Sequence, residues 1–248
     1  MIKFYNKTDE DAQIDIYGEI GESFWGESKS ASDFKKELNN LGEVKNIFIN
    51  INSPGGSVFD GLAMYNILKR HKAKVIVYVD GLAASAASFV AMAADEVIMP
   101  ENSYLMIHNA WSYAGGDKNE LRKMADTLEQ MDETISNIYA EKTGKEKEEI
   151  LKMMDEETWI NGKEALEIGF ADKNEEEKKI AANIGSFFMS KFKNIPNDLN
   201  IIEDEKEGKN TDEHREEPEI LEPVSIEQKL QEQQEKFNKI KLKILGGI

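Results

Sequence analysis

Apolar and polar residues alternate in two ways along the first hundred residues of the chain. Short apolar stretches, typical of buried strands, are followed by segments in which apolar residues recur every three to four positions, as on a helix face. The predicted strands are Ile14–Ile20, Ile47–Ile51, Val75–Val79 and Val97–Met99, and the predicted helices are Ala31–Leu41, Val58–Lys69 and Ser85–Ala94. Connections of this length favour parallel strands joined by crossover helices. The pattern predicts an α/β fold with functional loops where strands end and helices begin.

A longer amphipathic helix is predicted from Asp117 to about Lys142. One apolar stripe runs along it, formed at steps of three and four by Leu121, Met124, Leu128, Met131, Ile135 and Ile138. By default such a stripe packs on the protein's own core. The near-heptad spacing equally suits contact with another subunit, so both interpretations stay open.

The end of the chain differs in composition from the rest. From Asp198 to Glu222 it holds eleven acidic residues against three basic ones, which is typical of a disordered linker. Apolar residues then recur near helical spacing up to Gly246-Gly247 and predict a short amphipathic helix, either a docking element or a marginal solvated helix. We therefore expect a folded domain over residues 1–190, an acidic linker over 191–224 and a helix over 225–248.

Composition narrows the function classes. The chain of 248 residues with 40% hydrophobic content can bury a sizeable core, and the absence of Cys excludes disulfides, thiolate metal sites and a cysteine nucleophile. No apolar run approaches the roughly 20 residues that span a bilayer, and no signal core follows the N-terminus, so we expect a soluble cytoplasmic protein without a membrane partner. The net charge of −17 argues against nucleic-acid binding because it repels phosphate backbones.

Two glycine-containing turns stand between a predicted strand and a predicted helix. In Asn52–Ser57 the paired glycines let the backbone turn with its N–H groups exposed, which can bind an anion, although alone this is also an ordinary turn. It lacks both the Walker ending and the G-x-G-x-x-G spacing of nucleotide loops. The second turn, Gly81–Ser85, places a hydroxyl at the start of a helix, where N–H groups would stabilise charge on a nearby oxygen.

The Ser85 hydroxyl has a structural alternative and a competitor. Without further support, Ser85 could equally be the N-cap of the helix. Ser88, one turn later, is the competing hydroxyl, but inside a helix its oxygen is expected to bond a backbone carbonyl or to pack. Ser85 is therefore the preferred candidate nucleophile.

A serine nucleophile needs a base, and the chain has three histidines. His71 belongs to a cationic helix end, and His214 lies in the acidic stretch, which is not expected to hold a fixed geometry. His108 ends an apolar strand and is the preferred base. A triad also needs a carboxylate, for which Asp155-Glu156-Glu157 offers three candidates that spacing does not separate.

Four segments in this order resemble the Clp-type caseinolytic serine peptidases: Ile51–Val58, Gly81–Ser85, Pro100–Ser103 with Met106–His108, and Thr143-Gly144. The resemblance covers roughly Ile14 to Asp172. Its closing details, Thr158-Trp159 and Glu164–Asp172, look most like the phage branch of Clp-related head maturation (prohead) proteases.

The resemblance implies a role for each site residue. It makes Ser85 the nucleophile, His108 the base, and the backbone N–H groups of Gly56 and Ala86 the oxyanion hole. Registering Thr143-Gly144 and Glu164–Asp172 without a gap places Glu157 at the family's acidic position, with Asp155 as second choice. The implied reaction is hydrolysis of peptide bonds through an acyl-enzyme, which needs neither a metal nor a cofactor.

The resemblance also implies an architecture and partners. The fold would be a crotonase-like spiral of β-β-α units, with Asp117–Lys142 as a protruding handle helix through which rings of a homo-oligomer stack. The phage branch implies a capsid or scaffold polypeptide as substrate, in the host cytoplasm or the procapsid. Residues 1–11 lack a match to the axial loops that face an ATP-driven unfoldase, so an unfoldase partner is not carried over.

Four other functions compete with head maturation. The chain could be the general proteolytic subunit of an ATP-dependent Clp-type protease, an acyl-CoA enzyme on the same crotonase-like scaffold, or a catalytically silent assembly component. The last two do not explain the pairing of Ser85 with His108. A signal-peptide peptidase would instead use a Ser–Lys dyad.

Overall fold

A computed structural model describes residues 2–8, 10–21, 30–176, 184–185, 192–196, 199 and 201–202. The chain divides into two compact units, residues 1–205 and 206–248, and every described residue belongs to the first. The predicted C-terminal helix, most of the predicted linker and His214 lie outside the described residues.

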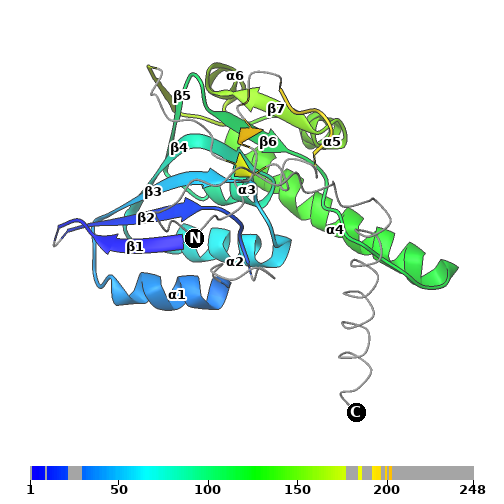
Figure 1. The fold of residues 1–248 in the computed structure, drawn as a ribbon, viewed down its shortest axis with the longest axis horizontal. Coiled ribbons are helices and arrows are strands. Elements are labelled where there is room, and N and C mark those ends of the chain that lie inside the picture. Colours follow the sequence, from blue (N-terminus) through cyan, green and yellow to red (C-terminus); the bar gives the residue numbers. More distant parts are fainter. Residues whose placement is uncertain are drawn as a thin grey trace, which may run out of the picture. The chain divides into compact units, whose positions relative to one another are not determined.

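One mixed sheet of eight strands forms the centre of the described part (Figure 1). The strands are β1 (Ile2–Asn6), β2 (Asp11–Tyr17), β3 (Asn46–Ser53), β4 (Lys74–Ala84), β5 (Glu96–Pro100), β6 (Tyr104–Ile107), β7 (Thr158–Asn161) and β8 (Lys173–Glu175). Their order is β1-β2-β3-β4-β5-β8, with β6 paired to both β4 and β7. β2, β3, β4, β5 and β8 run parallel, so the predicted α/β fold is confirmed. β9 (Ile184–Gly185) and β10 (Ile201–Ile202) form a separate parallel pair.

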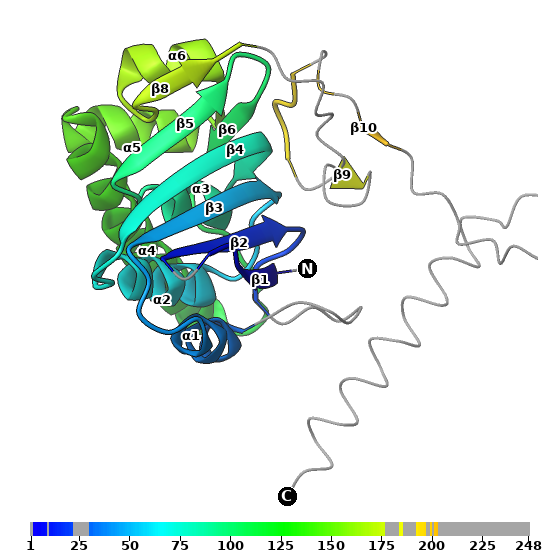
Figure 2. The same ribbon diagram turned by 90° about the vertical axis from the view of Figure 1, so that its left-hand side faces the viewer.

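Six described helices complete the unit: α1 (Ala31–Asn40), α2 (Val58–Lys69), α3 (Ala86–Ala91), α4 (Lys118–Thr143), α5 (Lys147–Asp155) and α6 (Gly162–Ile168). α1 and α2 lie side by side on one face of the sheet, and α3 packs against α2 (Figure 2). The core between helices and sheet is built from fully buried side chains such as Phe34, Ile49 and Val77. Alternation within β2 and β3 sends every second side chain into this core, as the pattern predicts.

Sequence signals set both ends of α4, the predicted handle helix. Asp117 accepts the N–H groups of Asn119 and Glu120, and the Glu120 carboxylate accepts the N–H of Asp117, which completes a capping box. The helix ends at Gly144, whose φ of 70° is left-handed. The predicted boundaries of the long helix are therefore confirmed to within a residue.

The apolar stripe of α4 is only partly used by the core. Ile135, Ile138 and Tyr139 are buried, whereas Leu121 near the start is 45% exposed. Figure 1 shows the N-terminal half of α4 extending beyond the sheet. Packing on the chain's own core therefore accounts for the C-terminal half of the stripe alone. None of the described helices has the length and apolar character needed to cross a bilayer.

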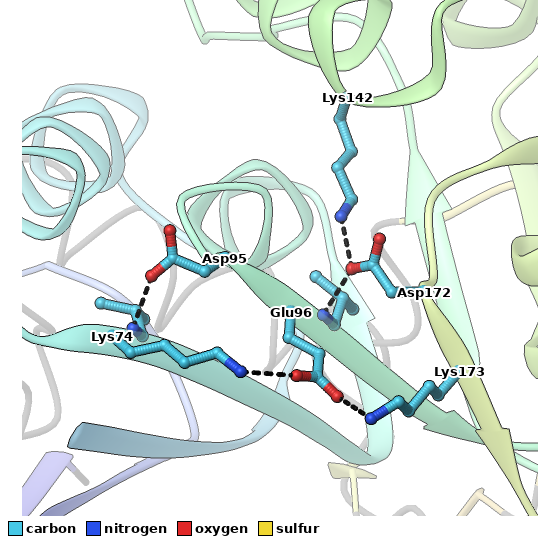
Figure 3. A network of polar contacts seen from close by, with 8 residues as sticks. Lys74, Asp95, Glu96, Lys142, Asp172 and Lys173 are labelled. Carbon is cyan, nitrogen blue, oxygen red and sulfur yellow. Dashed lines mark hydrogen bonds and ion pairs between the residues drawn. The ribbon is translucent and has the colours of Figure 1, made fainter.

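A polar network fastens the C-terminal end of α4 to the sheet (Figure 3). The Asp172 carboxylate accepts the backbone N–H of Val97 on β5 at 2.7 Å and the Lys142 ammonium of α4 at 2.6 Å. Glu96 beside it accepts the ammonium groups of Lys74 at 2.9 Å and of Lys173. The buried C-terminal half of α4 and this network together fix the direction in which the N-terminal half of the helix projects.

The segment Gly81–Ser85 differs from the turn that the sequence predicts. β4 continues to Ala84. Its first part pairs with β3 and β5, and its last residues, Leu82, Ala83 and Ala84, pair with β6. The ladder with β6 satisfies the backbone groups of these residues, so Ser85 alone makes the turn into α3, which begins at Ala86.

Candidate active site

Ser85 holds a conformation that is rare outside glycine. Its φ is 52° and its ψ is −123°, while its N–H donates to Met106 O at 2.9 Å and so extends the pairing of β4 with β6. Ser85 is the N-cap residue of α3 by position, but its side chain makes no capping hydrogen bond to the helix. Positive φ at a non-glycine residue costs free energy and is found mainly where function requires it. The turn presents the Ser85 hydroxyl as a sharp strand-to-helix corner does in serine hydrolases.

The loop that contains Gly55 and Gly56 lies directly against Ser85. A Cβ atom on Gly55, where φ is 93°, would stand 2.7 Å from the Cβ of Ser85 and 2.6 Å from the carbonyl oxygen of Ala84. Only glycine permits this approach. The two turns that the sequence places 30 residues apart therefore form one site.

Two backbone N–H groups flank the serine. Gly56 is exposed, and its bridge to Ile20 uses the carbonyl of Gly55 and the N–H of Ser57, not its own N–H. Ala86 is the first residue of α3, where an N–H has no acceptor within the helix. Both groups can therefore donate to an oxygen bound beside Ser85.

His108 follows the last residue of β6 and contacts the serine directly. Its Nε2 lies 2.8 Å from the Ser85 hydroxyl oxygen. Burial lowers the pKa of the imidazole, the charge of Glu157 raises it, and the charge of Lys193 lowers it. The net direction is downward, so the imidazole is neutral and can accept a proton at neutral pH.

Strand register separates the acidic candidates behind His108. Antiparallel pairing of β6 with β7 ends at Ile107 opposite Thr158, so His108 and Glu157 are the next residues beyond the same end of the paired strands. Glu157 is 8% exposed and has a φ of 50°. Among the described residues no hydrogen bond joins it to His108, and the two interact through charge. Asp155 instead accepts Asn109 Nδ2 at 2.7 Å, so its carboxylate binds the residue beside the histidine.

The competing hydroxyl and histidine have other tasks. Ser88 is fully buried and its hydroxyl contacts the Ser85 carbonyl at 2.5 Å and the Tyr139 hydroxyl at 2.6 Å, so the expected bond to a backbone carbonyl is confirmed. His71 lies after α2, its Nδ1 accepts the N–H of Ala73, and burial lowers its pKa. His71 therefore acts as a hydrogen-bond acceptor just after α2, and the basic residues at the end of this helix are Lys69 and Arg70.

An open cavity of about 500 Å³ adjoins the serine. It is lined by Ser85, His108 and Gly56 and by apolar side chains from α3 and α4, namely Phe89, Met124, Leu128 and Met131. Part of the handle stripe thus faces this cavity. Within the described ranges, no group of three or more His, Asp or Glu side chains is placed to hold a metal ion.

Sequence reasoning missed one contributor, the segment Phe192–Asn194. The Phe192 ring packs edge-on against His108 with 5.8 Å between centroids, and the N–H groups of Lys193 and Asn194 donate to Glu157. The expected boundary at residue 190 therefore separates the domain from residues that contact its site. Two apolar residues, Phe192 and Ile195, before the acidic stretch are the signal that could have revealed it.

The sequence of this chain is similar to those of known proteins over most of the described part. A sequence model of the Clp protease family matches residues 1–178. An ATP-dependent Clp protease proteolytic subunit 2 of Treponema denticola is 35% identical over 145 residues, which cover 57% of this chain and 72% of that protein. The ATP-dependent Clp protease proteolytic subunit of Chlorella vulgaris is 30% identical over 149 residues, which cover 59% of this chain and 74% of that protein. The ATP-dependent Clp protease proteolytic subunit 2 of Tropheryma whipplei is 32% identical over 131 residues, which cover 52% of this chain and 72% of that protein.

Proposed function

Because this chain belongs to the Clp protease family and is a serine-type peptidase, we propose that Ser85, His108 and Glu157 carry its activity. The single observation that supports the proposal most is the 2.8 Å contact between His108 Nε2 and the Ser85 hydroxyl oxygen, on a residue with a positive φ. Glu157 is the proposed acid because it lies just beyond the paired ends of β6 and β7 and its charge acts on His108, while Asp155 binds Asn109.

The proposed reaction begins with acylation of Ser85. Neutral His108 accepts the hydroxyl proton at Nε2 while the oxygen attacks the substrate carbonyl carbon. The negative charge of Glu157 stabilises the imidazolium that forms. The imidazolium then gives its proton to the leaving amine, the C–N bond breaks, and water attacks the acyl-enzyme in the same way.

The proposed oxyanion hole consists of the N–H groups of Gly56 and Ala86. The tetrahedral intermediate carries its charge on the former carbonyl oxygen, and preorganised donors there cost no reorganisation during the reaction. The close approach of Gly55 to Ser85 and to the N–H of Ala86 supports this pair of donors. An apolar substrate side chain next to the cleaved bond fits the cavity lined by Phe89, Met124 and Leu128.

For the biological role we favour the proteolytic subunit of an ATP-dependent protease. All three relatives described above carry that name, and none is named as a phage protease. Assembly into a homo-oligomer is part of this proposal, because the exposed half of the α4 stripe suits a second copy of the chain. Capsid or scaffold processing is the second candidate, since Thr158-Trp159 and Glu164–Asp172 resemble the phage head maturation branch.

Degradation of a stably folded fluorescent protein separates these two roles. We expect the full chain to cleave short unfolded peptides alone and to degrade the folded protein only with a Clp-type ATPase and ATP, because a folded chain exposes no extended segment to Ser85. Loss of fluorescence over time is the measurement. Cleavage of a co-expressed phage capsid precursor without any ATPase, together with no ATPase stimulation, would establish the second role instead.

The pH dependence of activity tests the acid. Because burial lowers the pKa of His108, kcat/KM should fall on the acid side only below the ordinary histidine value of about 6.5. Glu157→Gln removes the charge that raises this pKa, so the acid limb should move to still lower pH, with kcat reduced about 10⁴-fold. Asp155→Asn is the control, for which we expect a smaller loss of kcat and an acid limb at the same pH as in the wild type. The reverse ranking of these two variants would make Asp155 the acid.

A further inference from the structure

We propose that the segment Phe192–Asn194 is a positioning element that holds Glu157 and His108 in their working arrangement. It lies beyond residue 178, where the match to the family ends. The proposal rests on the proposed function and deepens it, because it assigns residues that act on the site through Glu157 and His108 without touching the substrate bond.

The carboxylate of Glu157 is held from one side. The backbone N–H groups of Lys193 and Asn194 donate to the same oxygen, Oε1, at 2.5 and 2.8 Å, and Trp159 Nε1 lies 3.4 Å from it. Hydrogen bonds to a charged acceptor are strong, so these donors hold the nearly buried carboxylate in place. All three described donors engage Oε1.

The imidazole is held from its edge by an aromatic ring. Phe192 lies edge-on to both His108, at 5.8 Å between centroids, and Trp159, at 5.6 Å. It therefore packs between the proposed base and the residue two positions after the proposed acid. Such packing restricts rotation of the imidazole and keeps water away from it.

The segment is itself anchored to the strands that carry the site. Phe192 and Ile195 pack on a small apolar cluster made by Leu82 and Ala84 of β4, Met106 of β6 and Leu199. Asn194 Nδ2 donates to the carbonyl of Glu156 at 2.8 Å. Since β4 leads to Ser85 and β6 leads to His108, the segment ties the supports of all three proposed triad members together.

The segment supports the site and does not block it. Ser85 and Gly56 still line the open cavity of about 500 Å³, and Phe192 forms one part of its wall. An inhibitory lid would instead cover the serine. The expected consequence of loosening the segment is therefore a loss of activity.

The test compares proline and alanine at position 193 in the full-length chain. Lys193→Pro and Lys193→Ala both remove the side-chain charge that lowers the His108 pKa, and only proline also removes the N–H that binds Glu157. We expect Lys193→Pro to have kcat/KM about 100-fold below Lys193→Ala, mainly through kcat, because a misplacement near 1 Å costs that much. Its acid limb should also lie at lower pH, since the charge of Glu157 no longer stays beside His108.

A second pair, Asn194→Pro and Asn194→Ala, repeats the comparison with the other donor, and Phe192→Ala tests the ring while leaving the backbone unchanged. Circular dichroism and oligomeric state establish that each variant is folded. If both proline variants stay within about twofold of their alanine partners and Phe192→Ala keeps wild-type kcat and pH profile, the inference is overturned. Failure of wild-type protein to react with a fluorophosphonate at Ser85 is a different result, because it overturns the proposed function first.

Discussion

Ser85→Ala should abolish covalent labelling by a fluorophosphonate and lower kcat by a factor of the order of 10⁶, with the fold unchanged. The hydroxyl oxygen is the proposed attacking atom, and its side-chain hydrogen-bond partner among the described residues is His108. Alanine removes this oxygen and leaves the backbone turn, which is held by the N–H of Ser85 and by the contact with Gly55. Mass spectrometry of the labelled protein and peptide hydrolysis measure the two effects.

Ser88→Ala is the matched control for this prediction. It removes a hydroxyl one turn away that is buried against Tyr139, so labelling at Ser85 should persist while thermal stability falls, because the Tyr139 hydroxyl loses a partner. Labelling that survives Ser85→Ala would move the nucleophile to another residue. Thioester turnover that survives the same change would support the acyl-CoA enzyme instead.

His108→Ala is expected to lower kcat by a comparable factor, of the order of 10⁶, because attack by an unactivated hydroxyl needs a base within hydrogen-bond distance. The reaction with the fluorophosphonate should slow for the same reason. Burst kinetics with an activated ester, measured beside circular dichroism, separate the chemical defect from a folding defect.

The control for this change is His71→Ala, at the end of α2. Its imidazole accepts only the N–H of Ala73 among the described groups, so the variant should keep wild-type kcat. Activity retained in His108→Ala would contradict the triad and favour a Ser–Lys dyad. A high pH optimum in that variant would identify a lysine as the base.

Local patterns in the sequence predict many of the strands and helices of the fold. The apolar stretches of β3 and β4 and the capped, striped helix α4 were predictable because alternation, caps and turn glycines act within a few residues of one another. The end of β4 was not predictable from local patterns. Its last three residues belong to a segment that reads as a turn of small residues, and they become a strand because they pair with β6. Pairing between distant strands overrides local preference there.

By itself, the sequence determined which residue types are available for the chemistry. Because the chain has no Cys and three histidines, composition left a hydroxyl as the candidate nucleophile and few residues as candidate base. Local periodicity placed Ser85 and His108 at the ends of strands. Tertiary structure alone decided how they meet. Pairing of β6 with β7 brings together the strand ends that precede His108 and follow Glu157, Gly55 packs on Ser85, and Lys193 donates to Glu157. These contacts join segments 30 to 100 residues apart, and their geometry depends on the whole sheet, which no local pattern of residues records.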